Sequence, residues 1–379
     1  MTAAPIWFNR PAVTGREQAC IAEAIASGHL SGDGAFTARC REALEAITGA
    51  PKVLLTTSCT HALEMAVMLA DVGPGDEVIC PPFTFVSSVN AFVLRGAVPV
   101  FVDIRPDTLN IDEQQVEAAI TPRTRALMVV HYAGVACDLD ALADIARRHG
   151  LVLIEDNAHG LFGRYKGQPL GSRGATSTLS FHETKNLTCG EGGALVINDP
   201  ALVERAEVLR EKGTNRSRFY RGQVDKYTWV DIGSSYLPSE ILAAYLWAQI
   251  DAREAIQARR HAIWSRYQAE LAGWADRHGV RRPTVPEGCE HPAHLFYLLL
   301  PSLEARQGLI AHLRARQILA VFHYLPLHLS DQGLRYGGRA GQHPITEAIA
   351  DHLVRLPLHY HLEPADQDRV IEAVTSVTA

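Results

Sequence analysis

The stretch ALMVVHYAGVACDLDALADIARRHGLVLIEDN, residues 126–157, holds two short apolar runs separated by a helix-like segment. Nearly continuous apolar runs are typical of parallel strands that are buried on both faces, and parallel neighbours need a crossover helix between them. The second run ends on Glu155, Asp156 and Asn157. The stretch therefore predicts two parallel strands with polar side chains at the end of the second one.

The same alternation extends from about Lys52 to Asp199. The apolar runs cover residues 52–56, 76–82, 98–104, 126–132, 151–157, 176–182 and 193–198. Seven such runs, separated by helix-like segments, predict a large α/β domain built on a mainly parallel sheet.

A second region is expected after this sheet. Residues 238–271 have a long helical pattern with Ser239 as its cap, which indicates a connecting helix. Beyond it, the apolar runs 294–300 and 318–324 and a closing helix over 366–376 favour a smaller α+β domain. We expect a large domain with an N-terminal arm over residues 1–250 and a small C-terminal domain over 251–379.

Composition narrows the class of protein. The 379 residues are 47% hydrophobic and 21% charged, with a net charge of −6, and the basic stretch 216–226 is too short and diluted to indicate a nucleic-acid-binding face. The seven cysteines are odd in number and lack zinc-site spacing, which favours a reducing compartment. No signal-peptide pattern or membrane-length apolar run is present, so we expect a cytoplasmic protein without membrane or nucleic-acid partners.

In open α/β sheets, ligands bind beyond the carboxyl ends of the strands. This rule selects four segments of the chain for closer inspection. They are residues 58–60, 83–85, 156–159 and 182–185.

Lys185 and Asp156 are the two residues with the clearest chemical potential. Lys185, in SFHETKNLTCGEGG, can form an imine with a cofactor aldehyde and then serve as a base, provided that its amine is neutral part of the time. Asp156 can keep the ring nitrogen of pyridoxal phosphate protonated, although a helix cap or an arginine partner would explain it equally well. Their positions at the ends of different strands permit both to reach one flat cofactor.

Other polar and aromatic residues could complete such a site. Ser58, Cys59 and Thr60 precede an apparent helix whose first N–H groups suit a phosphate, with simple helix capping as the alternative. Ser180 is a further hydroxyl for that phosphate. Phe83 and Phe85 could stack on a planar cofactor, where a core position is the alternative. Of His159 and His182, His159 is favoured as the neighbour of the cofactor because it shares a loop with Asp156, with a structural hydrogen bond as the alternative.

The combination of SCTHALEMA, PPFTFVSS, EDNAH and SFHETKN…GEGGALVIND, in this order, resembles the DegT/DnrJ/StrS family of sugar-nucleotide aminotransferases. The resemblance covers essentially the whole chain. It implies the fold of the fold-type I enzymes that use pyridoxal 5′-phosphate, similar to aspartate aminotransferase. Some members remove a hydroxyl group and carry histidine at the position of Lys185, so the lysine favours transamination.

The resemblance also implies roles for individual residues. It implies Lys185 as the Schiff-base lysine and Asp156 as the partner of the ring nitrogen. The further roles that it implies are His159 beside the cofactor's face or 3-oxygen, Cys59, Thr60 and Ser180 as phosphate contacts, Phe85 as the stacking ring, and Ser235 as a phosphate contact from an unassigned subunit. Ser235 stands where many relatives have asparagine, and Asn157, Ala158 and His159 stand where many have Ala-Ala-Gln.

Further stretches, among them GHLSGDGAFT, VVHYAGVACDLD and AVFHYLPLH, are similar to family members that act on one dTDP-sugar. This similarity implies amino transfer from L-glutamate to the 4-keto group of dTDP-4-dehydro-6-deoxyglucose, giving dTDP-4-amino-4,6-dideoxygalactose and 2-oxoglutarate. It also implies a homodimer. Two alternatives stay open: formation of the gluco epimer or use of another nucleotide sugar, and a cofactor-binding regulator without catalytic activity.

Overall fold

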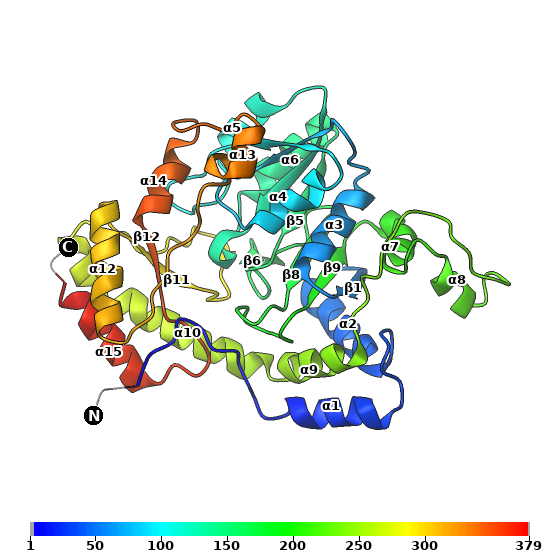
Figure 1. Ribbon diagram of the computed structural model, residues 1–379, viewed down its shortest axis with the longest axis horizontal. Coiled ribbons are helices and arrows are strands. Elements are labelled where there is room, and N and C mark those ends of the chain that lie inside the picture. The colour runs from blue at the N-terminus through cyan, green and yellow to red at the C-terminus, as the bar shows by residue number, and fades with distance from the viewer. Residues whose placement is uncertain (1–3, 378–379) are drawn as a thin grey trace.

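The computed structural model describes residues 4–377, and its centre is a seven-stranded sheet (Figure 1). The strand order is β1-β9-β8-β5-β4-β2-β3, and only β9 runs against the others. The strands are β1 (Lys52–Thr56), β2 (Glu77–Cys80), β3 (Val98–Phe101), β4 (Thr124–Val130), β5 (Val152–Asp156), β8 (Thr176–Ser180) and β9 (Gly193–Ile197). All seven predicted strands are therefore confirmed, as is the mainly parallel α/β fold.

Helices cover both faces of this sheet. The first half of the chain holds α1 (Glu17–Ala26), α2 (Ala35–Thr48), α3 (Cys59–Leu69), α4 (Val86–Val93), α5 (Glu113–Val116) and α6 (Leu139–His149). Alternate residues of one strand face opposite layers: Leu54 packs with α3 and α7 (Val203–Arg210), whereas Val53 and Leu55 pack with α2 and α9 (Glu240–Asp251). This double coverage explains why the strands read as continuous apolar runs.

The expected connecting helix over 238–271 is divided in two. Ser239 caps α9 by accepting a hydrogen bond from the Leu242 amide at 3.5 Å, as predicted. Helix α9 ends at Asp251, the backbone of Ala252 (φ −91°, ψ 6°) departs from helical geometry, and α10 (Arg253–Glu270) follows. Figure 1 shows α9 and α10 running along one side of the molecule, α9 beneath the large sheet and α10 beneath the C-terminal elements.

The C-terminal elements surround a separate apolar cluster. It joins α10, α12 (Leu303–Ala315) and α15 (Pro364–Thr375) to the antiparallel pair β11 (Phe296–Leu299) and β12 (Leu353–Leu356). The remaining elements are α8 (Arg216–Tyr220), α11 (Ala272–Arg277), α13 (Asp331–Arg335), α14 (Pro344–His352), and the short strands β6 (Arg164–Tyr165), β7 (Gln168–Pro169) and β10 (Cys289–Glu290).

Two details of this region differ from the sequence prediction. Residues 318–324 form only isolated bridges, Ile318 with Ile6 and Val321 with Arg355, and the partner of β11 is β12, which no sequence pattern indicated. Ile6 belongs to the C-terminal cluster, so the N-terminal arm packs on the end of the chain. The predicted domain division at residue 250 stays a prediction.

A buried carboxylate ties the N-terminal helices to α9. Glu240 is 2% exposed, and its side chain accepts hydrogen bonds from the amides of Phe36 and Thr37 at 2.7 and 3.0 Å, at the start of α2. These amides lack intrahelical partners, so Glu240, which is 204 and 203 residues away from them in the sequence, serves as the cap of α2.

No helix within residues 4–377 is long and apolar enough to cross a membrane.

Candidate active site

A cavity of about 640 Å³ lies beyond the carboxyl ends of β5 and β8. Its wall comes from the start of α3, the loop after β8, the N-terminal arm and β12. Eight of the nine sequence-predicted site residues line it: Ser58, Cys59, Thr60, Phe85, Asp156, His159, Ser180 and Lys185. Residues from β5 and β8 come together because these strands are adjacent and parallel, so Asp156 at the end of β5 and Ser180 at the end of β8 lie at the same edge of the sheet.

Asp156 is held firmly at the floor of the cavity. Its side chain is buried, Ser88 donates its hydroxyl to Oδ2 at 2.6 Å, and the amide of Ala158 donates to Oδ1 at 3.1 Å. The Ser88 and Thr84 hydroxyl oxygens are in turn 2.9 Å apart. Asp156 has no arginine partner among the ion pairs of residues 4–377, so the arginine alternative is excluded there. Both hydrogen bonds orient an anion toward the cavity.

Lys185 enters the cavity from the turn that follows β8. Its amide donates to the carbonyl of His182 at 2.9 Å, which fixes the backbone of this turn. Burial of the side chain lowers the pKa of Lys185 below the ordinary lysine value, and the Arg355 guanidinium lowers it further, while Cys59 and Asp156 act in the opposite direction. The environment thus favours a neutral amine more than water does.

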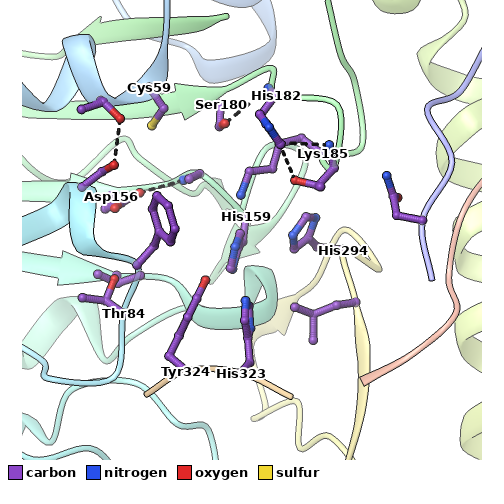
Figure 2. Close-up of a pocket in the computed structure, with 18 of the residues that line it drawn as sticks. Cys59, Thr84, Asp156, His159, Ser180, His182, Lys185, His294, His323 and Tyr324 are labelled. Atoms are coloured by element: carbon purple, nitrogen blue, oxygen red, sulfur yellow. Dashed lines mark hydrogen bonds between the residues drawn. The ribbon is translucent and has the colours of Figure 1, made fainter. Parts of the chain in front are cut away.

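His159 belongs to a group of aromatic rings beside Lys185. Its ring stacks on that of His294 with centroids 4.2 Å apart, and the His323 ring is nearly parallel to it at 6.2 Å. Burial, with Lys185 and Arg355 nearby, lowers the pKa of His159 well below its usual range, so the ring is neutral. Figure 2 shows His159, His294 and His323 gathered on the same side of Lys185.

The start of α3 offers hydrogen-bond donors to an anion. Ser58 caps the helix by accepting from the His61 amide at 3.1 Å, so the capping alternative holds for its hydroxyl. The amides of Cys59 and Thr60 come before the first intrahelical hydrogen bond and suit a phosphate. The Thr60 hydroxyl lies 2.8 Å from that of Ser87, a further hydroxyl on the cavity wall.

These residues fit pyridoxal phosphate on observations of the structure. The buried Nδ1 of His159 has no hydrogen-bond partner within residues 4–377, as expected of a group that faces a ligand. A Cβ on Gly193 would lie 2.4 Å from the Cys59 nitrogen, so β9 approaches the helix start as closely as glycine alone allows. The cavity thus supplies an anion, a group of hydroxyls and amides, and a lysine.

Replacement of Gly193 by alanine is expected to displace the start of α3. The new methyl group would overlap backbone atoms, so we expect a loss of about 1–3 kcal/mol of stability and weaker cofactor binding. Thermal unfolding and a pyridoxal phosphate titration would measure both. Gly308→Ala is the matched control. Gly308 lies in α12, and a Cβ added to it would meet no atom within 4 Å. Equal cofactor affinity in G193A and G308A would contradict the expectation.

Phe85 and Ser235 have contrasting positions. Phe85 is 58% exposed at the cavity, so the core alternative is wrong for it, whereas Phe83 is buried in the core. Ser235 lies outside the cavity of Lys185. It lines a second cavity of about 860 Å³ together with Arg210 and Arg221. A phosphate contact from Ser235 therefore requires a partner subunit and stays a prediction.

Sequence reasoning missed several residues that line the first cavity or support a residue that does. Ser88 supports Asp156, yet only the packing of α4 against β5 reveals it, although the Thr84–Ser88 spacing of one helical turn is compatible with their contact. Arg355 comes from β12, a strand that was not predicted. Phe8 and Asn9 arrive from the N-terminal arm.

Comparisons with known proteins agree with this geometry. The chain is 32% identical over 98% of its length to the spore coat polysaccharide biosynthesis protein SpsC of Bacillus subtilis, 96% of which is covered. Its structure resembles the aminotransferase TlmJ of Streptoalloteichus hindustanus with a TM-score of 0.90 and 31% identity, covering 98% of each chain. Spr1654 of Streptococcus pneumoniae, which carries the description of a sugar aminotransferase, gives a TM-score of 0.91 in its PMP form and 0.90 in its PLP form, with 29% identity and 98% of each chain covered.

These matches confirm the predicted fold and, at the level of the family, the predicted cofactor. The model of the DegT/DnrJ/EryC1/StrS aminotransferase family matches residues 11–375, almost the entire chain. The chain belongs to the DegT/DnrJ/EryC1/StrS aminotransferase family.

Proposed function

We propose that the protein is a pyridoxal 5′-phosphate-dependent aminotransferase that moves the amino group of L-glutamate to C4 of dTDP-4-dehydro-6-deoxy-D-glucose. The products are dTDP-4-amino-4,6-dideoxy-D-galactose and 2-oxoglutarate. The observation that carries the proposal is the meeting of Asp156 and Lys185 in one cavity, from adjacent strands of the sheet. Family membership supports the transamination.

Asp156 and the helix start would hold the two ends of the cofactor. When bound, pyridoxal phosphate supplies an aldehyde for the donor amine and a ring that accepts electrons. Asp156, fixed by Ser88 and Ala158, would hold a proton on the ring nitrogen. The amides of Cys59 and Thr60 and the hydroxyl of Ser180 would bind the phosphate, Phe85 would stack on the ring, and His159 would lie beside its face or its 3-oxygen.

Lys185 would serve as both attachment point and base. Its lowered pKa makes the neutral amine more accessible, and this form would take the proton from Cα of the donor, after which the ammonium form would give a proton to C4′ of the cofactor. In the half-reaction with the sugar, Lys185 would carry a proton the opposite way, from C4′ to C4 of the sugar. The neutral ring of His159 does not compete for that proton. The face of the sugar that Lys185 protonates decides whether the galacto or the gluco product forms.

Support for the sugar comes from sequence and from relatives. The stretches 28–37, 129–140 and 320–328 contain the similarity to members that act on the dTDP-sugar. The relative SpsC is a spore coat polysaccharide biosynthesis protein, and Spr1654 is described as a sugar aminotransferase. The cavity volume of about 640 Å³ leaves room for a cofactor and one substrate.

In a homodimer, Ser235 could contact the cofactor phosphate in the partner subunit. Its cavity also contains Arg216 and Arg221, which could meet the pyrophosphate of a substrate held by a partner subunit. Segment 216–232 exposes large apolar side chains, including Trp229 at 78% and Tyr220 at 69%, as expected of a surface that another copy covers.

The test is a defined reaction with product identification. Purified protein is incubated with pyridoxal phosphate, L-glutamate and dTDP-4-dehydro-6-deoxyglucose, and the configuration at C4 of the product is read by NMR. An axial amino group at C4 supports the proposal, and an equatorial one assigns the gluco epimer instead. Reaction with the corresponding UDP-sugar alone would assign another nucleotide. A protein that binds the cofactor but reacts with no amino donor would indicate a regulator without catalytic activity.

A further inference from the structure

Arg355 places a guanidinium group in the wall of the candidate active site. It lies on β12, and its side chain lines the same cavity as Lys185 and Asp156. One nitrogen, Nη2, donates to the carbonyl of Phe322 at 3.1 Å, and the group lies over the ring of Phe8, 4.6 Å from its centroid. These contacts fix the plane of the guanidinium group but leave its charge uncompensated.

No carboxylate within residues 4–377 forms an ion pair with Arg355, and its buried Nε has no hydrogen-bond partner there. Arg210 in the second cavity differs, because it is paired with Asp33 at 2.7 Å. Arg355 is half-buried, a cation without an ion-pair partner is costly in such a position, and burial lowers the pKa of its guanidinium group. Such a group is expected to receive an anion from a ligand.

The surrounding groups show where that anion would lie. The charge of Arg355 lowers the pKa of Lys185, His159, His294 and His323, so it acts on the region around the reacting amine. Asp156 already has its own donors in Ser88 and Ala158. The cavity therefore contains an available cation beside Lys185, separate from the proposed position of the ring nitrogen.

The two substrates of the proposed reaction carry different anions. In an amino-acid donor, a carboxylate is bonded directly to the Cα whose proton Lys185 removes. In a nucleotide sugar, the pyrophosphate is attached at C1, across the sugar ring from the C4 that reacts. A cation beside Lys185 consequently matches the donor carboxylate better than the pyrophosphate, and arginine binds carboxylates through two parallel hydrogen bonds.

We propose that Arg355, oriented by Phe8 of the N-terminal arm, binds the α-carboxylate of the amino donor and thereby determines donor recognition. The inference rests on the proposed aminotransferase function and adds a residue to it. The arm is anchored on both sides of Phe8, because Ile6 pairs with Ile318 and the Asn9 side chain donates to the carbonyl of Glu183 at 3.1 Å, two residues before Lys185. It thus connects the C-terminal elements to the lysine turn.

The test compares Arg355→Met and Arg355→Lys with Arg306→Met. Arg306 is a matched control: it also lies over an aromatic ring, Phe322 at 5.4 Å, donates to a carbonyl, that of Ala350 at 3.3 Å, and has a buried Nε without a partner in residues 4–377. Unlike Arg355, it does not line the cavity of Lys185. Loss of packing alone would therefore affect both methionine variants alike.

Two measurements report on binding of the donor carboxylate. Calorimetry records the binding of glutarate, a dicarboxylate without an amino group, to protein with and without cofactor, and stopped-flow absorption records the half-reaction with L-glutamate or L-alanine. R355M is expected to weaken glutarate binding and raise the glutamate concentration for half-maximal rate by about 10- to 100-fold. L-Alanine, which has only the α-carboxylate, should lose as much. R355K should lose less, and R306M should stay within about twofold of the unaltered protein.

The opposite half-reaction separates the two anions. Protein carrying pyridoxamine phosphate is mixed with dTDP-4-dehydro-6-deoxyglucose, and R355M should keep its affinity for the sugar. Failure of the unaltered protein to bind glutarate, equal losses in R355M and R306M, a loss with glutamate but not with alanine, or a loss confined to the sugar half-reaction would each overturn the inference. If no keto-sugar reacts but glutarate binding still depends on Arg355, the proposed function fails and the carboxylate site stands.

Discussion

Replacement of Lys185 by alanine is expected to slow the half-reaction with L-glutamate by about 100- to 10,000-fold. The residue lines the cavity with Asp156, and burial lowers the pKa of its amine, so its loss removes both the attachment point and the base. The remaining contacts at the start of α3 should still bind pyridoxal phosphate. The measurement is the absorption of the bound cofactor after glutamate is added.

Lys166→Ala serves as the control for Lys185→Ala. Lys166 is exposed, pairs with Asp140 at 2.6 Å and lies outside the cavity. Its removal should leave the half-reaction within about twofold of the unaltered rate, because changes at exposed positions rarely exceed about 0.5 kcal/mol. A K185A protein whose absorption changes at the rate of the unaltered protein would refute the assignment of Lys185.

Asp156→Asn is expected to lower the same rate by about 100- to 1,000-fold. Asparagine keeps the shape of the side chain but removes the negative charge that would stabilise a protonated ring nitrogen. Because the amide of Asn can still accept from Ser88 or Ala158, the fold should survive. Single-turnover absorption measures the rate, and circular dichroism of the bound cofactor checks that it occupies the same chiral site.

Ser88→Ala tests the support of Asp156 separately. Ser88 does not line the cavity of Lys185. Its hydroxyl donates to Oδ2 of Asp156 at 2.6 Å and orients the carboxylate. Loss of a hydrogen bond to a charged group should slow the half-reaction by about tenfold, which is less than the effect of D156N. An unchanged rate in D156N, or a larger loss in S88A than in D156N, would contradict the role given to Asp156.

Much of the fold was readable from local sequence. Strands buried on both faces must be apolar throughout, and this requirement made β1 to β5, β8 and β9 visible as separate runs. The rule that ligands bind at carboxyl strand ends then selected Asp156 and Lys185 without reference to their contacts. The C-terminal region was harder to predict, since β12 is a short strand whose partners, β11 and Val321, lie far from it in the sequence.

The residues of the candidate site also differ in whether local sequence predicts them. Residues that directly follow a strand or begin a helix, such as Cys59, Asp156 and Lys185, have positions that local pattern determines. Phe8 and Arg355 reach the cavity from the N-terminal arm and β12, and Ser88 reaches Asp156 from a helix face. Nothing in their own sequence neighbourhood indicates these contacts. Their approach depends on packing between segments far apart in the chain.

The sequence by itself determined the α/β class, the strand ends that carry chemistry, and the lysine and aspartate expected to act on a cofactor. Only the tertiary structure decided that Ser88 orients Asp156, that Phe85 is exposed where Phe83 is core, and that Ser235 lies in another cavity. It also placed an uncompensated Arg355 beside Lys185. The physical reason is that strand and helix patterns arise from neighbours in the chain, whereas burial and charge compensation depend on groups that folding brings together.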